Sequence, residues 1–334
     1  MTKTRLKIGP ILVSIVVAFF IFALVFSPAV YMKSVLNGIL LWGTAVLPAL
    51  FPFFFFTKLL TELGIVDILA TRLETITRKL YNVPGISSYV FCLSVLSGYP
   101  VGAKLVSELH QKDVLSKGAV YRTMAFTSTS GPLFVIGTVG IGMFAHKFAG
   151  LIILCAHIIS ALLNGLIWRK FKLQKEDYVQ TSAGAKAVDI SKALNDSMYN
   201  AIISILIVGG YIAIFFMVID VLNNFHILST ISHCIEWCLG IVGLPKSIAA
   251  GIASGIIEVT RGCFDLSKSG AHIGVVIIAA SALISWGGFS IHMQALTFLK
   301  KCNISIGVYF LQKLTHCVIS IGVAAVLVFA FRLI

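Results

Sequence analysis

Long apolar runs separated by short polar segments dominate the chain. The clearest runs cover residues 8–30, 35–60, 149–168, 193–222 and 304–331. About 20 apolar residues in a helix cross a bilayer, and basic residues favour the cytoplasmic side. Because the first run follows a basic N-terminus, the pattern predicts a first transmembrane helix that starts in the cytoplasm. A signal peptide with Ser27-Pro28-Ala29 near its cleavage point is the alternative interpretation of this run.

Other apolar runs are too short to cross a bilayer and end in small or polar residues. Residues 86–96 lead into Ser97-Gly98-Tyr99-Pro100, and residues 133–144 follow Ser130-Gly131-Pro132. The second half shows the same character in residues 251–265 and in the apolar run 273–284, which leads into Ser285-Trp286-Gly287-Gly288-Phe289-Ser290. Such interruptions predict broken or re-entrant helices, whose freed backbone groups must face protein or a water-filled cavity.

The two halves of the chain resemble each other in organisation. Ser130-Gly131 follows Ser97-Gly98 by 33 residues (130 − 97), and Gly287-Gly288 follows Ser254-Gly255 by the same interval (287 − 254). The offset between the halves is 157 residues (254 − 97). Chance coincidence in a glycine-rich membrane chain is the alternative explanation. The spacing predicts an internal repeat.

Charge placement indicates that the two repeats are inverted. Residues 36–60 would run toward the cytoplasm, whereas residues 193–217 start at a basic linker and run away from it. Both segments carry potential breakers, namely Pro48 and Pro52 in one and Gly209 and Gly210 in the other. Amphipathic residues 67–80 predict a helix at the cytoplasmic face, and 105–122 form a polar amphipathic stretch. The predicted divisions are a helix in 1–34, one repeat in 35–168, a cytoplasmic linker in 169–192 and a second repeat in 193–334.

Composition narrows the class of protein. Hydrophobic residues make up 58% and charged residues 12% of the 334 positions, and the mean hydropathy is +0.98. Soluble domains carry about twice that charged fraction. The net charge of +13 comes from Lys and Arg between apolar runs, which favours anionic lipid rather than nucleic acid as the partner. Cys234 and Cys238 lack a second ligand pair for a metal, so neither a metal nor a cofactor is predicted.

The predicted helix breaks suit the binding of a small anion. A helix N-terminus offers free N–H groups and partial positive charge, and residues such as Ser128, Thr129 and Ser130 are good N-caps. Ionisable residues at membrane depth are usually functional. Lys104 and Arg261 would attract a carboxylate or phosphate, and Glu258 would hold a coupling cation or pair with Arg261. A structural Glu258–Arg261 pair and an interfacial Lys104 are the alternatives.

The segment 286–294 adds an aromatic and further polar groups. Trp286 could stack on a flat ring, and Gly287-Gly288 could expose backbone to a ligand; His292 and Gln294 could instead bond to neighbouring helices. His110, His146, His157 and His272 are interpreted as interface or packing residues. The candidate substrate-binding residues are Ser97, Gly98, Tyr99, Pro100, Lys104, Ser128, Thr129, Ser130, Gly131, Glu258, Thr260, Arg261, Trp286, Gly287, Gly288, Ser290 and Gln294.

These motifs resemble the YlbJ-type sporulation integral membrane proteins of the nucleoside-recognition, or Gate-domain, group. The resemblance rests on the segments 97–104, 131–134, 255–262 and 286–294 and covers the chain from about Leu36 onward. It implies a role in endospore formation, with transport of dipicolinate, an aromatic dicarboxylate, across the outer forespore membrane.

Together these observations predict a transporter of a small anionic or polar solute. A nucleoside-type carrier and a non-transporting component of a sporulation membrane complex are the alternatives, and partners would include the bilayer and either a second copy or other membrane proteins. No zincin motif, Walker loop or nucleophile elbow occurs, so an enzyme is not predicted.

Overall fold

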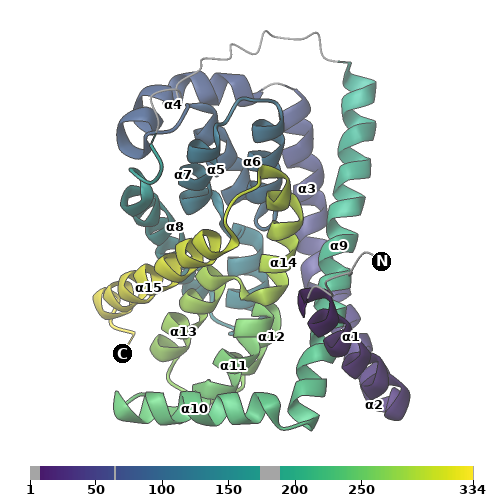
Figure 1. The fold of residues 1–334 in the computed structure, drawn as a ribbon. Helices are drawn as coiled ribbons and strands as arrows, with labels where there is room; N and C mark the ends of the chain where they lie inside the picture. The colour runs from purple at the N-terminus through teal and green to yellow at the C-terminus, as the bar shows by residue number, and fades with distance from the viewer. Residues whose placement is uncertain (1–7, 64, 174–188, 334) are drawn as a thin grey trace.

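A computed structural model describes residues 8–63, 65–173 and 189–333, and every element within them is helical (Figure 1). The elements of the first half are α1 (Ile8–Phe26), α2 (Pro28–Leu41), η1 (Trp42–Val46), α3 (Leu47–Glu62), α4 (Ile65–Tyr81), α5 (Ile86–Ser97), α6 (Val101–Gln111), α7 (Lys117–Thr127), η2 (Leu133–Met143) and α8 (Lys147–Trp168). Those of the second half are α9 (Ile190–Asn224), α10 (Ile227–Ile241), η3 (Lys246–Ile248), α11 (Ala249–Ile257), α12 (Val259–Ser267), α13 (Ile273–Trp286), α14 (Gly288–Leu299), η4 (Lys300–Cys302) and α15 (Ile306–Ala330).

Apolar helices of membrane-spanning length confirm the predicted class, an integral membrane protein of all-α architecture. Five helical stretches among the described residues are long and apolar enough to cross a bilayer, and a bent pair would make a sixth. The five are Pro28–Val46, Phe148–Trp168, Ile190–Asn224, Ile273–Cys302 and Ile306–Ala330. Many of their large apolar side chains are exposed, as expected of helices that face lipid.

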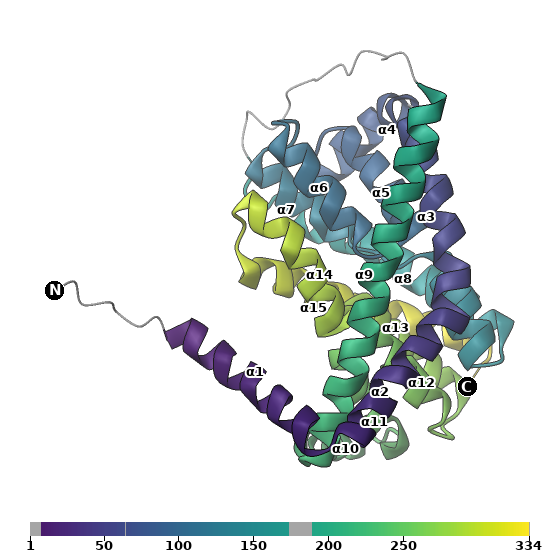
Figure 2. The same ribbon diagram turned by 90° about the vertical axis from the view of Figure 1, so that its right-hand side faces the viewer.

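The first helix ends earlier than the apolar pattern predicts. The run in residues 8–30 is divided at Ser27, where α1 ends and α2 begins with Pro28. Proline suits the first turn of a helix because it lacks the N–H that would have no partner there. Figure 2 shows α1 projecting away from the rest of the molecule, and its C-terminal end packs on α9 through Ala23 and Val221. The basic residues before Ile8, and residues 174–188 of the predicted linker, lie outside the described residues.

Helices α3 and α9 lie side by side and run in opposite directions, as charge placement predicted (Figures 1 and 2).

The predicted interruption at Gly209-Gly210 is wrong, because α9 is continuous from Ile190 to Asn224. A side chain at Gly209 would lie 2.5 Å from the Trp42 ring, so this glycine permits close helix packing. In the partner segment, a π-helical turn, η1, precedes Pro48, and Pro52 lies inside α3.

The order of elements is similar in the two halves. A long helix, α3 or α9, leads into a helix at one end of the molecule, α4 in the first half and α10 in the second (Figure 1). A helical hairpin follows, α5–α6 near one end and α11–α12 near the other. An interrupted segment comes next, α7–η2 or α13–α14, and a final apolar helix, α8 or α15, completes each half. This is the order that an inverted repeat would give.

One hydrophobic core joins the two halves. Its buried residues include Phe134 and Ile153 from the first half and Ile212, Ile277 and Val328 from the second. Since apolar packing and interhelical hydrogen bonds, rather than burial from water, hold membrane helices together, this shared core fixes how the halves meet.

The predicted amphipathic stretch in residues 105–122 is instead divided between α6 and α7, and α7 is buried from Gly118 to Thr127. Arg122 is fully buried there. Its guanidinium donates to the backbone carbonyls of Asn82, Phe171 and Lys172 at 2.9–3.0 Å. Arg122 therefore ties α7 to the chain segments that follow α4 and α8.

Replacing Gly262 by Ala is expected to lower the free energy of unfolding by about 1–3 kcal/mol, the usual penalty of overpacking. The added Cβ would overlap the backbone of Gly255, where α12 crosses α11. Gly210→Ala is the matched control, because nothing lies within 4 Å of its Cβ position. Thermal unfolding of the purified protein in detergent measures both. Equal unfolding temperatures for the two variants would contradict this close approach.

Candidate functional site

Four interruptions of the helices meet in the interior of the molecule. They lie at residues 98–100, 128–132, 258 and 287. A side chain at Gly98 would come within 2.8 Å of the Gly131 nitrogen, and one at Gly288 would lie 3.0 Å from the Ile257 carbonyl oxygen. The first two interruptions therefore touch each other, as do the last two.

A cavity of about 60 Å³ lies among these interruptions, enough for several water molecules. Nine of the predicted site residues line it, and they come from all four broken segments. They are Ser97, Gly98, Tyr99, Ser130, Gly131, Glu258, Thr260, Ser290 and Gln294. The apolar part of the wall is formed by Val46, Leu50, Phe134, Val208, Ile212, Val259 and Ile291.

The first interruption follows from the backbone conformation of one glycine. Gly98 has φ of +76° and ends α5, a conformation that residues with a Cβ rarely adopt. The Ser97 hydroxyl donates to the Thr57 hydroxyl of α3 at 3.0 Å. The Ser94 hydroxyl donates to the Thr127 carbonyl, the last residue of α7. The two interruptions of the first half are thereby held against each other and against α3.

The break in the α11–α12 hairpin lies three residues after the predicted position. Gly255 is inside α11, and the helix ends at Glu258, whose backbone is extended (φ −139°, ψ 118°). A Cβ at Gly255 would overlap the Leu283 side chain of α13, so Gly255 serves close packing. Sequence spacing alone could not distinguish a glycine that breaks a helix from one that lets two helices approach.

Glu258 is the charged residue in the wall of the cavity. Its side chain is 2% exposed and accepts the Arg261 backbone N–H at 2.7 Å, so Glu258 is the N-cap of α12. The Thr260 backbone and hydroxyl also bond to this carboxylate. The partial positive charge of a helix N-terminus stabilises a carboxylate in this position. The carboxylate is therefore held by backbone groups beside the cavity.

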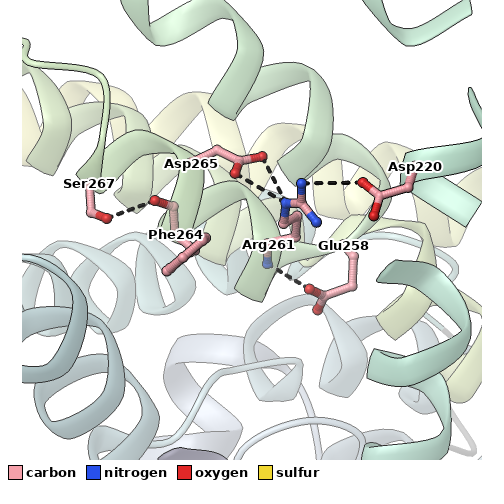
Figure 3. Close-up of polar contacts among 6 residues, drawn as sticks. All are labelled: Asp220, Glu258, Arg261, Phe264, Asp265 and Ser267. Carbon is pink, nitrogen blue, oxygen red and sulfur yellow. Dashed lines mark hydrogen bonds and ion pairs between the residues drawn. The ribbon is translucent and has the colours of Figure 1, made fainter. Parts of the chain in front are cut away.

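Arg261 is not part of the cavity wall. Figure 3 shows its guanidinium between two carboxylates, with Nη2 3.3 Å from Asp220 and Nε 3.1 Å from Asp265. Its guanidinium also lies 5.1 Å from the centre of the Phe216 ring. Arg261 bonds to Glu258 through its backbone N–H and not through its guanidinium. The alternative of a Glu258–Arg261 side-chain pair is therefore wrong.

The structure also keeps Lys104 and the aromatic Trp286 off the cavity wall. Lys104 is half-buried and donates to the Asn200 side-chain oxygen at 3.3 Å. Trp286 donates to the Ile256 carbonyl at 3.3 Å, and its ring packs edge-on against His292. His292 contacts Tyr309 at 3.2 Å, so it bonds to a neighbouring helix, as one of the two interpretations expected.

The remaining candidates support the interruptions without lining the cavity. Pro100 precedes α6, and the Thr129 hydroxyl donates to that of Ser94 at 3.1 Å. Gly287 and Gly288 both have positive φ, at +94° and +70°. The Ser128 carbonyl accepts a hydrogen bond from a lysine that the sequence interpretation had not selected.

That lysine, Lys313, belongs to a buried polar cluster behind the cavity wall. Its Nζ donates to the Tyr99 hydroxyl at 2.7 Å and to the Ser128 carbonyl at 3.2 Å. His157 of α8 accepts the Ser130 backbone N–H at Nε2, and its Nδ1 lies 2.8 Å from the Ser285 hydroxyl. Both residues lie inside apolar runs, where an ionisable side chain is itself a sign of function or of a polar network. The apolar context of Lys313 is therefore the sequence signal that identifies it, whereas the packing role expected of His157 does not include its bond to Ser130.

Fold and site together define a polytopic α-helical membrane protein with a transporter-like architecture, in which broken helices surround an interior cavity. The Gate family model, described as nucleoside recognition, matches residues 44–147. Those residues include α3 and the first two interruptions.

Two known proteins are similar over most of the chain. The sporulation integral membrane protein YlbJ of Bacillus subtilis (strain 168) is 26% identical over 326 residues, covering 92% of this chain and 80% of the relative. A solved structure of CNTnw, a nucleoside transporter (CNT), in an outward-facing state has a TM-score of 0.59 at 13% identity and covers 86% of this chain and 76% of the other. The resemblance to the YlbJ-type and Gate group is confirmed, and the second likeness concerns the fold alone.

Replacing Arg261 by Ala is expected to lower the free energy of unfolding by about 1–3 kcal/mol, because Asp220 and Asp265 would be left facing each other unpaired. Thermal unfolding of the purified variant measures the loss. Adding Asp220→Asn and Asp265→Asn to Arg261→Ala should restore most of it, since the repulsion between the carboxylates is removed. An Arg261→Ala protein as stable as the wild type would show that solvent satisfies both carboxylates.

Proposed function

We propose that this protein is a membrane transporter of a small anionic or polar solute, and that the cavity among the four interruptions binds it. The observation that carries the proposal is the meeting of broken segments from both halves around one cavity, to which each segment contributes polar groups. Secondary transporters bind their substrates near the bilayer midplane at discontinuous helices of this kind. The cavity wall combines hydroxyl, amide and carboxylate groups with an apolar side, which suits a small polar solute.

Residues 35–168 and 193–334 form the two inverted repeats of this transporter, with the linker in 169–192 on the cytoplasmic side. In such folds one part of the molecule rocks against the other and exposes the site to each side in turn. The similar order of elements and the opposite directions of α3 and α9 support this assignment. The polar cavity residues bind the solute, and Glu258 holds a coupling cation or a donor group of the solute.

Dipicolinate is the solute that we propose, and the outer forespore membrane is the proposed location. Support comes from the similarity to a sporulation integral membrane protein over 92% of the chain. A nucleoside is the second candidate, favoured by the nucleoside-recognition match and by the fold shared with CNTnw. A non-transporting component of a sporulation complex is the third, favoured by the same relative's name.

Uptake of labelled dipicolinate by proteoliposomes containing the purified protein tests the proposal. Wild-type vesicles should accumulate the label above empty vesicles. Glu258→Gln should lower uptake by about tenfold or more, because hydrogen bonds to a charged group contribute about 1.5–3 kcal/mol. The matched control is Glu236→Gln, which makes the same change at the surface of α10 and should transport as the wild type does.

Three outcomes would redirect the assignment. Uptake of labelled nucleosides without uptake of dipicolinate would favour the second candidate. No flux of either solute, together with a partner that copurifies with the chain, would favour the component of a complex. Unchanged dipicolinate uptake by Glu258→Gln would remove Glu258 from the mechanism.

A further inference from the structure

We propose that Lys313 sets the charge preference of the cavity: it is a positioning residue that acts through Tyr99 and makes the site favour an anionic solute over a neutral one of the same shape. This inference rests on the proposed function, since it concerns the same cavity. It differs from the sequence interpretation, which gave this role to Lys104 and Arg261.

The position of Lys313 places a cation one side chain away from the cavity. The residue lies in the N-terminal half of α15 and is 2% exposed. Its Nζ donates to the Tyr99 hydroxyl at 2.7 Å and lies 4.7 Å from the centre of the Tyr99 ring. Tyr99 lines the cavity and donates its own hydroxyl proton to the Ile284 carbonyl at 3.1 Å. Tyr99 is therefore fixed between the lysine and the solute space.

No carboxylate among the described residues lies within ion-pair distance of Lys313. Both of its hydrogen-bond acceptors, the Tyr99 hydroxyl and the Ser128 carbonyl, are neutral. An ion without a counter-charge is unfavourable in a low-dielectric interior. An anion in the adjoining cavity would supply the missing charge.

The other cations near the site are compensated or distant from the cavity. The charge of Arg261 is balanced by Asp220 and Asp265, and Lys104 lies off the cavity wall beside Asn200. His157 accepts the Ser130 N–H at Nε2, so that nitrogen carries no proton in this arrangement. Of these four basic residues, Lys313 is the one that adjoins the cavity wall and whose charge no carboxylate among the described residues balances.

Glu258 gives the same cavity a negative group, but that carboxylate is stabilised by the N-terminus of α12. A solute with a carboxylate toward Tyr99 and a donor group or coupling cation toward Glu258 would satisfy both charges. The effect of Lys313 is electrostatic and acts across one aromatic ring, where screening by water is weak.

Binding to the full-length protein in nanodiscs, measured by calorimetry, tests the inference with two probes of one shape. Dipicolinate carries two carboxylates, and pyridine-2,6-dicarboxamide is its neutral counterpart. Wild-type protein should prefer dipicolinate. Lys313→Gln should reduce that preference by about tenfold or more and leave the affinity for the diamide unchanged. Lys313→Arg, which keeps the charge, should retain most of the preference.

The control is Lys301→Gln, the same substitution at an exposed lysine in η4, which should leave the preference as in the wild type. A Lys313→Gln protein that keeps the wild-type preference would overturn the inference and leave the proposed function intact. Equal loss of affinity for both probes would also overturn it, because a purely structural role has that result. Wild-type protein that binds neither probe would contradict the proposed binding of this solute and, with it, the inference.

Discussion

Backbone amide and carbonyl groups that leave a helix within a bilayer need partners, since lipid offers none. In this protein the partners come from helices that pass behind the interruptions. Ser94 bonds to the Thr127 carbonyl, Lys313 to that of Ser128, and His157 accepts the Ser130 N–H. These contacts satisfy one broken segment from three other elements, so the fold can keep an irregular backbone in its interior.

The same requirement links the two halves. His157 of α8 holds Ser130 in the first half and contacts Ser285 in the second, and Tyr99 of the first hairpin bonds to the Ile284 carbonyl. Between α8 and α15, Asn164 donates to the Gln312 carbonyl and accepts from Thr315. The final helices of the halves therefore form a polar scaffold behind the cavity. Any motion that opened the cavity would have to preserve or exchange these bonds.

Only some of the buried ionisable side chains lie next to the cavity. Arg261 forms an ion-pair network with Asp220 and Asp265. The Arg122 guanidinium is bound by backbone carbonyls of residues that are distant from it in sequence. Glu258 and, through Tyr99, Lys313 are the charged groups next to the solute space. Ion pairing accounts for this difference: Arg261 is paired with Asp220 and Asp265, whereas no carboxylate among the described residues pairs with Lys313.

The sequence by itself determined the membrane class, the helical architecture and the location of most interruptions, because hydropathy and Gly, Ser and Pro positions act locally. Nine residues selected on those grounds do line the cavity, among them Tyr99, Glu258 and Gln294. Only the tertiary structure decided that Gly209 and Gly255 serve close packing, that Arg261 is already paired, and that Lys313 and His157 lie behind the cavity wall. The reason is physical: a helix break is a property of neighbouring residues, whereas the partner of a charge or the neighbour of a glycine comes from helices distant in sequence. A local sequence pattern does not predict which of these distant helices will be in contact.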